Sequence, residues 1–133
     1  MPIVVRVVSS EDYTKWVNER KQALAAARDD PNKTWDLAEL KDRGAKVYAA
    51  NCQACHQANG QGVKGAFPAL DGSQVVMNKE QQIAIMLNGK GAMPPWKQLS
   101  DVELASVATY VKNSWGNSAG TAVQPAEFAA ARK

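Results

Sequence analysis

The sequence predicts a small all-α domain that follows a short strand and a highly charged helix. Three observations support this fold class. Ser100 and Glu103 form a capping box at the start of a helix, and residues 36–51 form another helix that leads directly into two cysteines. A third helix spans about 78–89, since it opens with an asparagine cap and ends with Asn-Gly.

The last helix carries the clearest periodic pattern. Its apolar positions recur with helical spacing, and a glycine ends it: Leu104, Ala108, Val111 and Trp115, then Gly116. Gly44 and Tyr48 on the 36–51 helix, with Tyr110 on the last helix, fit a close helix crossing in which a ring packs over a small residue.

Length and composition are those of one globular domain. The chain has 133 residues with 45% hydrophobic and 22% charged residues, which is ordinary for a soluble protein. Its net charge of +3 is mild and its charges alternate in sign, which argues against nucleic-acid binding. It contains neither a transmembrane run nor a signal peptide, so these features alone favour the cytoplasm.

The two ends of the chain differ from its middle. Residues 3–8 are β-branched and predict one short strand, which needs a partner strand. Residues 9–30 predict a charged linker helix that stops before Pro31. The compact domain covers 35–117, and residues 118–133 predict a flexible tail with a weak helical turn after Pro125.

The chain's two cysteines and its one histidine lie within five positions, as Cys52, Cys55 and His56. A thiol–disulfide motif requires a preceding parallel strand, whereas the surroundings here are helical. A zinc site requires four ligands, and the chain has no other cysteine or histidine. Covalent haem attachment uses all three residues: both thiols form thioethers to the vinyl groups, and His56 binds the iron. The pattern therefore favours haem.

Methionine is the expected ligand on the other face of the iron, since no second histidine exists. Met1 is terminal, Met77 opens the third helix, and Met86 lies among apolar residues typical of a core. Met93 precedes two prolines, which restrict the backbone and hold a thioether rigidly. We therefore expect Met93 to be the ligand; its alternative role is a loop residue packed on the haem edge.

Further residues are expected to shape the haem pocket. The carbonyl of Pro68 is a candidate acceptor for the second ring nitrogen of His56, which would orient the ring. Phe67, Leu70 and Trp96 are candidate walls, although the first two also suit an ordinary core. The Trp96 indole N–H is also a candidate partner for a haem propionate.

With these motifs, residues 37–117 resemble a class I cytochrome c. The strings "CQACH", "NGQG", "FPAL", "GAMPPW" and "LASVATYV" occur in that order. The resemblance implies a class I cytochrome c fold, all-α, around one covalent haem c, with the first and last helices crossing. It also implies electron transfer as the function.

The start, "MPIVVRVVSSEDYTKWV", resembles the end of the copper-binding cupredoxin domain of cytochrome c oxidase subunit II. Some bacterial subunits of that family carry a fused cytochrome c after this point. The resemblance implies that residues 1–34 end a cupredoxin-like domain and that Met1 is one ligand of a binuclear copper site. The other expected copper ligands are absent, so the chain is interpreted as a C-terminal fragment.

This resemblance implies the partners and the location. Electrons would pass from a cytochrome donor to the binuclear copper centre of a haem-copper oxidase, on the periplasmic side of the bacterial inner membrane. The parent chain would be membrane-anchored, whereas this fragment would be soluble. The domain would carry electrons without being an enzyme itself. The rival interpretations are a freestanding periplasmic carrier or a dehydrogenase haem subunit, a haem protein with an open iron face, and a thiol-redox module.

Overall fold

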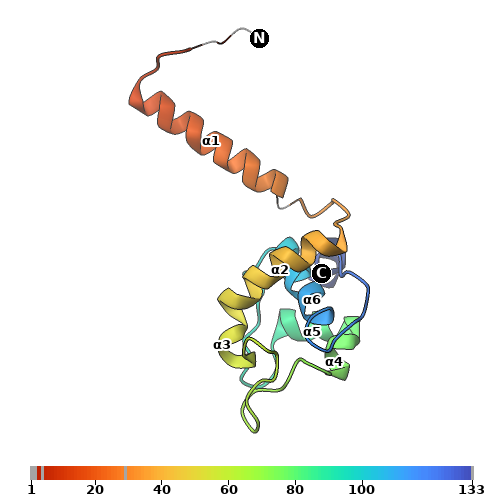
Figure 1. Cartoon of the computed structure of the whole chain (residues 1–133). Helices are drawn as coiled ribbons and strands as arrows, with labels where there is room; N and C mark the ends of the chain where they lie inside the picture. The colour runs from red at the N-terminus through yellow and green to blue at the C-terminus, as the bar shows by residue number, and fades with distance from the viewer. Residues whose placement is uncertain (1–2, 4, 29, 133) are drawn as a thin grey trace. The chain divides into compact units, whose positions relative to one another are not determined.

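The computed structural model describes residues 3, 5–28 and 30–132, and this described part is helical, with no strand (Figure 1). Residues 1–30 and 31–133 form two compact units. The all-α prediction is therefore confirmed. The helices are α1 (Ser10–Arg28), α2 (Leu37–Asn51), α3 (Gln53–His56), α4 (Gln74–Met77), α5 (Lys79–Asn88), α6 (Asp101–Lys112) and α7 (Pro125–Ala131).

The first unit contains α1, and the described residues before it have no regular secondary structure. The Ser9 hydroxyl caps α1 by accepting a hydrogen bond from the Asp12 N–H at 3.2 Å. The strand expected over residues 3–8 is absent at the described positions 3 and 5–8, while residue 4 lies outside the described residues. A strand is defined by hydrogen bonds to a neighbouring strand, and the described chain supplies none. No helix in the described part of the chain is both long and apolar enough to cross a membrane.

In the second unit, α2 packs chiefly against α6, as the sequence predicts. The contact is closest at Gly44, where a β-carbon would lie 2.0 Å from the Ser106 carbonyl oxygen and 2.6 Å from Tyr110 Cβ. The rings of Tyr48 and Tyr110 pack beside this point, with centroids 5.4 Å apart. Only glycine permits so close an approach of the two backbones.

Two short helices cover one side of α6. The Asn78 side chain caps α5 by accepting from the Gln81 N–H, and Gly89 ends the helix at a φ of 75°, both as predicted. The helix α4 was not expected, and it places Met77 at its end and not at the start of α5. The buried Lys112 ammonium donates to the Met77 carbonyl oxygen at 3.2 Å, where a helix carries partial negative charge.

The helix α6 begins at the predicted capping box but ends earlier than predicted. Both hydrogen bonds of the Ser100–Glu103 box are present. The helix stops at Lys112, before the predicted Gly116, because side chains take over the carbonyl groups of its last turn. The Ser114 hydroxyl, for example, donates to the Tyr110 carbonyl oxygen.

The segment 118–133 was expected to be a flexible tail, but its described residues, 118–132, pack into the domain. The helical turn predicted after Pro125 is confirmed as α7, which packs on α6 and α5. Val123 and Phe128 are 1% and 0% exposed and belong to the same buried cluster as Leu104 and Ala108 of α6. Burying a phenylalanine contributes about 2 kcal/mol, which offsets part of the entropy lost when the segment is ordered.

Polar contacts tie this segment to the rest of the domain. The Gln124 side chain accepts from the Trp35 N–H at 2.9 Å and donates to the Trp35 carbonyl oxygen at 3.0 Å. Glu127 pairs with Lys79 of α5. This segment is thus joined both to Trp35, two residues before α2, and to α5.

Replacing Gly44 tests the helix crossing. We expect Gly44→Ala to lower the free energy of unfolding by about 3 kcal/mol, because the added methyl group meets a backbone carbonyl that cannot move alone. Urea unfolding measures this. The control is Ala49→Gly at an exposed position of α2, which should cost only about 1 kcal/mol through helix propensity. A Gly44→Ala protein more stable than the parent would contradict the close crossing.

Candidate functional site

The cysteine pair lies on a helical turn that continues α2. The Cys52 N–H donates to the Tyr48 carbonyl oxygen at 2.8 Å, and the His56 N–H donates to the Cys52 carbonyl oxygen at 3.0 Å. Cys52 and Cys55 are three residues apart on this turn, so their side chains lie on one face. Both thiols are free and partly buried.

The His56 ring is buried and oriented. It is 8% exposed, and its Nδ1 lies 2.9 Å from the Pro68 carbonyl oxygen, the contact that the sequence predicts. A carbonyl oxygen only accepts, so Nδ1 carries the proton and donates it. The lone pair of the neutral ring then lies on Nε2, which is the nitrogen left to bind a metal ion.

Two aromatic side chains hold the loop that follows His56. The Tyr48 hydroxyl donates to the Gln57 carbonyl oxygen, and the Trp115 indole N–H donates to the Ala58 carbonyl oxygen at 2.9 Å. The Trp115 ring also fills the space beside Gly60, where a β-carbon would lie 2.5 Å from a ring carbon. The loop is therefore held against the end of α6.

The loop that carries Pro68 is held by Asn117. The Asn117 amide donates to the Leu70 carbonyl oxygen at 2.9 Å, and its oxygen accepts from the Gly72 N–H at 2.8 Å. The prediction from sequence missed this residue. The only signal was a polar cluster directly after a buried helix, which does not reveal partners 45 and 47 positions away.

The Met93 loop is fixed on both sides of the thioether. Lys90 and Met93 exchange two backbone hydrogen bonds at 3.1 and 3.0 Å, and the Trp96 N–H donates to the Met86 carbonyl oxygen at 2.8 Å. Gly89 lies so close that a β-carbon there would be 2.5 Å from the Met93 carbonyl oxygen. Met93 is therefore held in a tight turn and is partly buried.

The other predicted pocket residues divide between two apolar clusters. Leu70 and Cys52 pack against one cluster, which includes Tyr48, whereas Trp96 packs against the cluster that contains Leu104. Phe67 is partly buried and closes a small turn with Val63. The structure thus brings together His56 with Pro68, and Leu70 with the cluster beside Cys52, while Trp96 lies with the other cluster.

The thiol of Cys52 has the electrostatics of a buried group. Burial raises its pKa to about 11, and the charge of the neighbouring Cys55 adds to the increase. The thiol is therefore protonated at neutral pH. Reactive CxxC thiols have a lowered pKa instead, so this environment disfavours the thiol-redox interpretation.

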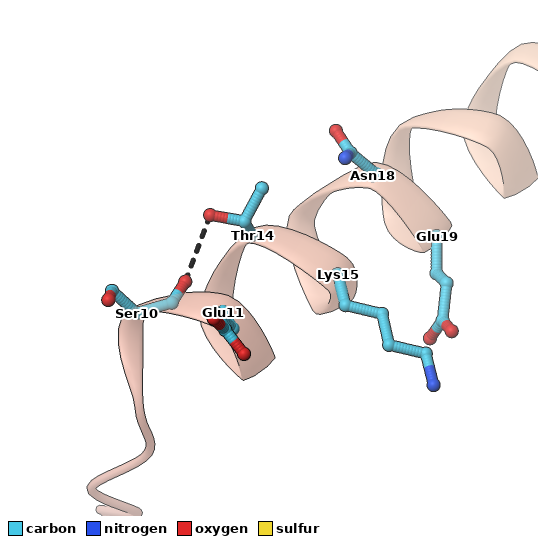
Figure 2. A pocket seen from close by; sticks show the side chains of 6 residues that line it. All are labelled: Ser10, Glu11, Thr14, Lys15, Asn18 and Glu19. Carbon is cyan, nitrogen blue, oxygen red and sulfur yellow. Dashed lines mark hydrogen bonds between the residues drawn. The ribbon is translucent and has the colours of Figure 1, made fainter.

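A surface hollow on α1 is a weaker candidate for a site. Its lining comes from one helix, and all of the side chains are exposed (Figure 2): Ser10, Glu11, Thr14, Lys15, Asn18 and Glu19. The hydrogen bond drawn there joins the Thr14 hydroxyl to the Ser10 carbonyl oxygen at 2.9 Å, which is local to the helix. A hollow with polar groups from one helix face lacks the enclosure of a ligand pocket.

Comparison with known proteins agrees with the cysteine–histidine geometry. The family described as cytochrome C oxidase, cbb3-type, subunit III matches residues 39–111. The chain is 36% identical over 98 residues to a cytochrome c-552 of Thermus thermophilus, an alignment that covers 61% of this chain and 66% of that protein.

In two further relatives, the matched region is a small part of a longer protein. The cytochrome c subunit of a quinone alcohol dehydrogenase from Gluconobacter oxydans is 32% identical over 99 residues, covering 64% of this chain and 21% of that one. The cbb3-type cytochrome c oxidase subunit CcoP of Azospirillum brasilense is 36% identical over 94 residues. This alignment covers 64% of this chain and 32% of that protein. The chain therefore spans from a fifth to about two thirds of the length of these three relatives.

The family match covers more than half of the chain, and the matched residues include Cys52, Cys55 and His56. The cofactor of this family is one covalently bound haem c, and its function is electron transfer. The chain is thus a cytochrome c domain and belongs to the family described as cytochrome C oxidase, cbb3-type, subunit III.

Proposed function

We propose that this cytochrome c domain carries electrons from a cytochrome donor to the binuclear copper centre of a haem-copper terminal oxidase. The observation that carries the electron-transfer part is the oriented His56 ring beside two cysteines on one helical face. The oxidase part is supported by the family match and by the relative named as an oxidase subunit.

The residues fit a covalent haem c. Cys52 and Cys55 would form the thioethers, and the His56 Nε2 and the Met93 sulfur would bind the iron. The haem, when bound, supplies a one-electron couple whose potential is raised by methionine ligation. The chemistry of this donor set suits haem, because two partly buried thiols on one helical turn lie next to one buried imidazole.

The surrounding residues keep the ligands still. Pro68 holds the imidazole by its Nδ1, so the ring does not rotate. The tight turn at Met93 limits movement of the sulfur when the charge on the iron changes, which favours fast electron transfer. We also propose Leu70 and Trp96 as pocket walls, with the Trp96 indole N–H donating to a propionate.

The proposed partner is the copper domain of the same oxidase subunit, subunit II. Residues 1–34 are proposed to end that cupredoxin-like domain, with Met1, which lies outside the described residues, as a copper ligand. Exposed β-branched side chains support this proposal, since Ile3, Val5 and Val7 are 89%, 82% and 95% exposed. Such side chains are normally covered in a sheet, which the copper domain would supply.

The family match does not extend to these first residues, because it covers 39–111. It therefore supports a haem domain in an oxidase and leaves the attached domain to be tested. The proposed location is the periplasmic side of the bacterial inner membrane, with the parent chain membrane-anchored and other oxidase subunits as neighbours.

A second candidate function is that of a freestanding carrier or a dehydrogenase haem subunit. The cytochrome c-552 and the quinone alcohol dehydrogenase subunit favour it, since both match with identities similar to that of the oxidase subunit. Both candidates use the same haem site and differ only in the partners that donate and accept the electron.

Replacing the cysteines tests the haem attachment. We expect the purified protein to exceed its bare mass of 14.3 kDa by one haem, and the pigment to resist acid–acetone extraction. Cys52→Ser combined with Cys55→Ser should release the pigment, since both thioethers are gone. Ala54→Ser, at an exposed position between them, should retain it. A colourless parent protein made with the haem-attachment machinery would contradict the proposal.

Replacing Met93 tests the second iron ligand. We expect Met93→Ala to lose the weak red absorption band of thioether-bound ferric iron, to bind carbon monoxide when reduced at neutral pH, and to lower the reduction potential. The matched control is Met77→Ala, since Met77 is 43% exposed at the end of α4 and should change none of these properties. Persistence of the band in Met93→Ala would refute the assignment.

The acceptor is tested by stopped-flow mixing of the reduced protein with a soluble oxidase copper domain. If the copper domain is the physiological acceptor, it should oxidise the reduced cytochrome domain with a second-order rate constant above about 10⁵ M⁻¹ s⁻¹, the usual lower bound for specific protein association. An unrelated copper protein of similar potential is the control. Equal rates with both would favour the freestanding carrier. The coding sequence upstream of Met1 offers a separate check, since it should encode a cysteine-rich copper motif and two hydrophobic spans.

A further inference from the structure

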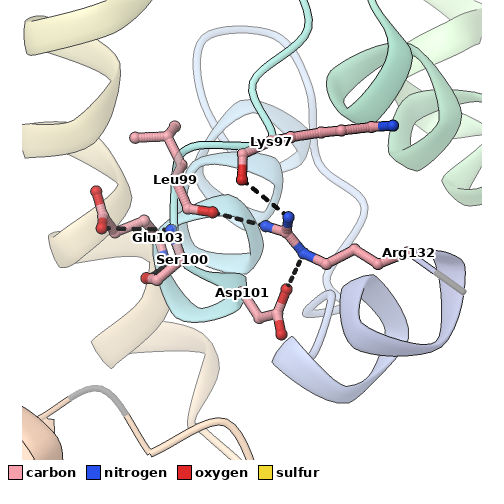
Figure 3. Close-up of polar contacts among 6 residues, drawn as sticks. All are labelled: Lys97, Leu99, Ser100, Asp101, Glu103 and Arg132. Carbon is pink, nitrogen blue, oxygen red and sulfur yellow. Dashed lines mark hydrogen bonds and ion pairs between the residues drawn. The ribbon is translucent and has the colours of Figure 1, made fainter.

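Arg132 makes hydrogen bonds to residues 97 and 99 of the loop that precedes α6 (Figure 3). The Arg132 guanidinium donates from Nη1 to the Lys97 carbonyl oxygen at 2.9 Å and from Nη2 to the Leu99 carbonyl oxygen at 2.6 Å. Its Nε pairs with Asp101 at 2.6 Å. All three contacts use the fork of a single planar group, a geometry that lysine cannot reproduce.

The loop that Arg132 contacts, residues 94–99, directly follows the Met93 turn. Pro94 and Pro95 follow the methionine, and their restricted backbone transmits movement to the next residues and does not absorb it. The Leu99 N–H donates to the Trp96 carbonyl oxygen at 3.1 Å, so residues 96–99 form a turn of their own. Arg132 therefore holds the far end of a stiff segment whose near end carries the sulfur.

Arg132 is itself anchored by a well-packed helix. It follows α7 directly, and Phe128 of that helix is fully buried. Its side chain is 28% exposed, and its partner Asp101 is 20% exposed. Gln124 fixes the start of the same helix to Trp35. Arg132 therefore contacts the loop from a segment that is itself packed into the domain core.

We propose that Arg132 is a positioning residue for the axial methionine. By holding the carbonyl groups of Lys97 and Leu99, it restrains the segment 94–99 and so keeps the Met93 sulfur from swinging away from its ligand position. This inference rests on the proposed function, because it requires Met93 to be the second iron ligand. The alternative is that Arg132 only stabilises the packing of α7 and has no effect on the loop.

Imidazole binding to the ferric holoprotein tests this positioning role. Added imidazole occupies the methionine side only when the sulfur is displaced, so its stopped-flow binding rate reports how easily the loop opens. We expect Arg132→Gln to raise this rate about tenfold, the change expected for losing charge-assisted hydrogen bonds. Amide hydrogen exchange at Leu99, whose N–H donates to the Trp96 carbonyl oxygen, should rise in parallel. Arg132→Lys should give an intermediate rate, and it is the substitute variant if Arg132→Gln does not fold.

Two controls separate positioning from general stability. Lys79→Gln removes the ion pair with Glu127 of α7 without changing a contact of the loop, and it should leave the imidazole binding rate unchanged. Asp101→Asn removes the charge partner but keeps both carbonyl contacts, and it should have a small effect. An unchanged rate in Arg132→Gln, or an equal rise in Lys79→Gln, overturns the positioning role while the red band of the parent protein is intact. A parent protein without that band overturns both this role and the Met93 assignment.

Discussion

The close crossing of α2 and α6 at Gly44 is the contact on which the rest of the haem site depends. Beyond the crossing, α2 continues into the turn that carries Cys52 and His56. The chain beyond α6 supplies Trp115 and Asn117, which hold the two loops beside His56. A shift of one helix along the other would therefore separate the histidine from the carbonyl group that orients it.

Local signals were sufficient for much of the fold and for the helical turn that carries Cys52, Cys55 and His56. The Ser100–Glu103 capping box, the Asn78 cap and the glycine at position 89 each act within one turn, so sequence alone reveals them. The cysteine–histidine turn is also local. The hydrogen bond from His56 to Pro68 spans 12 residues and was predictable only because a stiff, proline-containing loop follows at that distance.

The features missed by sequence reasoning depend on long-range contacts. Residues 118–133 are small and alanine-rich, so their composition indicates a loose tail, yet Phe128 fits a space bounded by α5 and α6. The loop contacts of Arg132 join it to residues 33 and 35 positions earlier. No periodicity or motif marks such partners, because they result from the packing of complete helices. The strand expected at 3–8 shows the opposite error, since local propensity cannot supply a neighbouring strand.

The hydrogen-bonded pair formed by Gln124 and Trp35 has a consequence for the evolution of this haem module. It joins Trp35, near the start of the second unit, to Gln124, which directly precedes α7. A module whose first and last segments pack together can be inserted or appended in a longer polypeptide without distorting either neighbour. This architecture suits a domain that is joined to different partners in different proteins. It agrees with the different shares of the relatives' length that the matched region occupies, 66%, 32% and 21%.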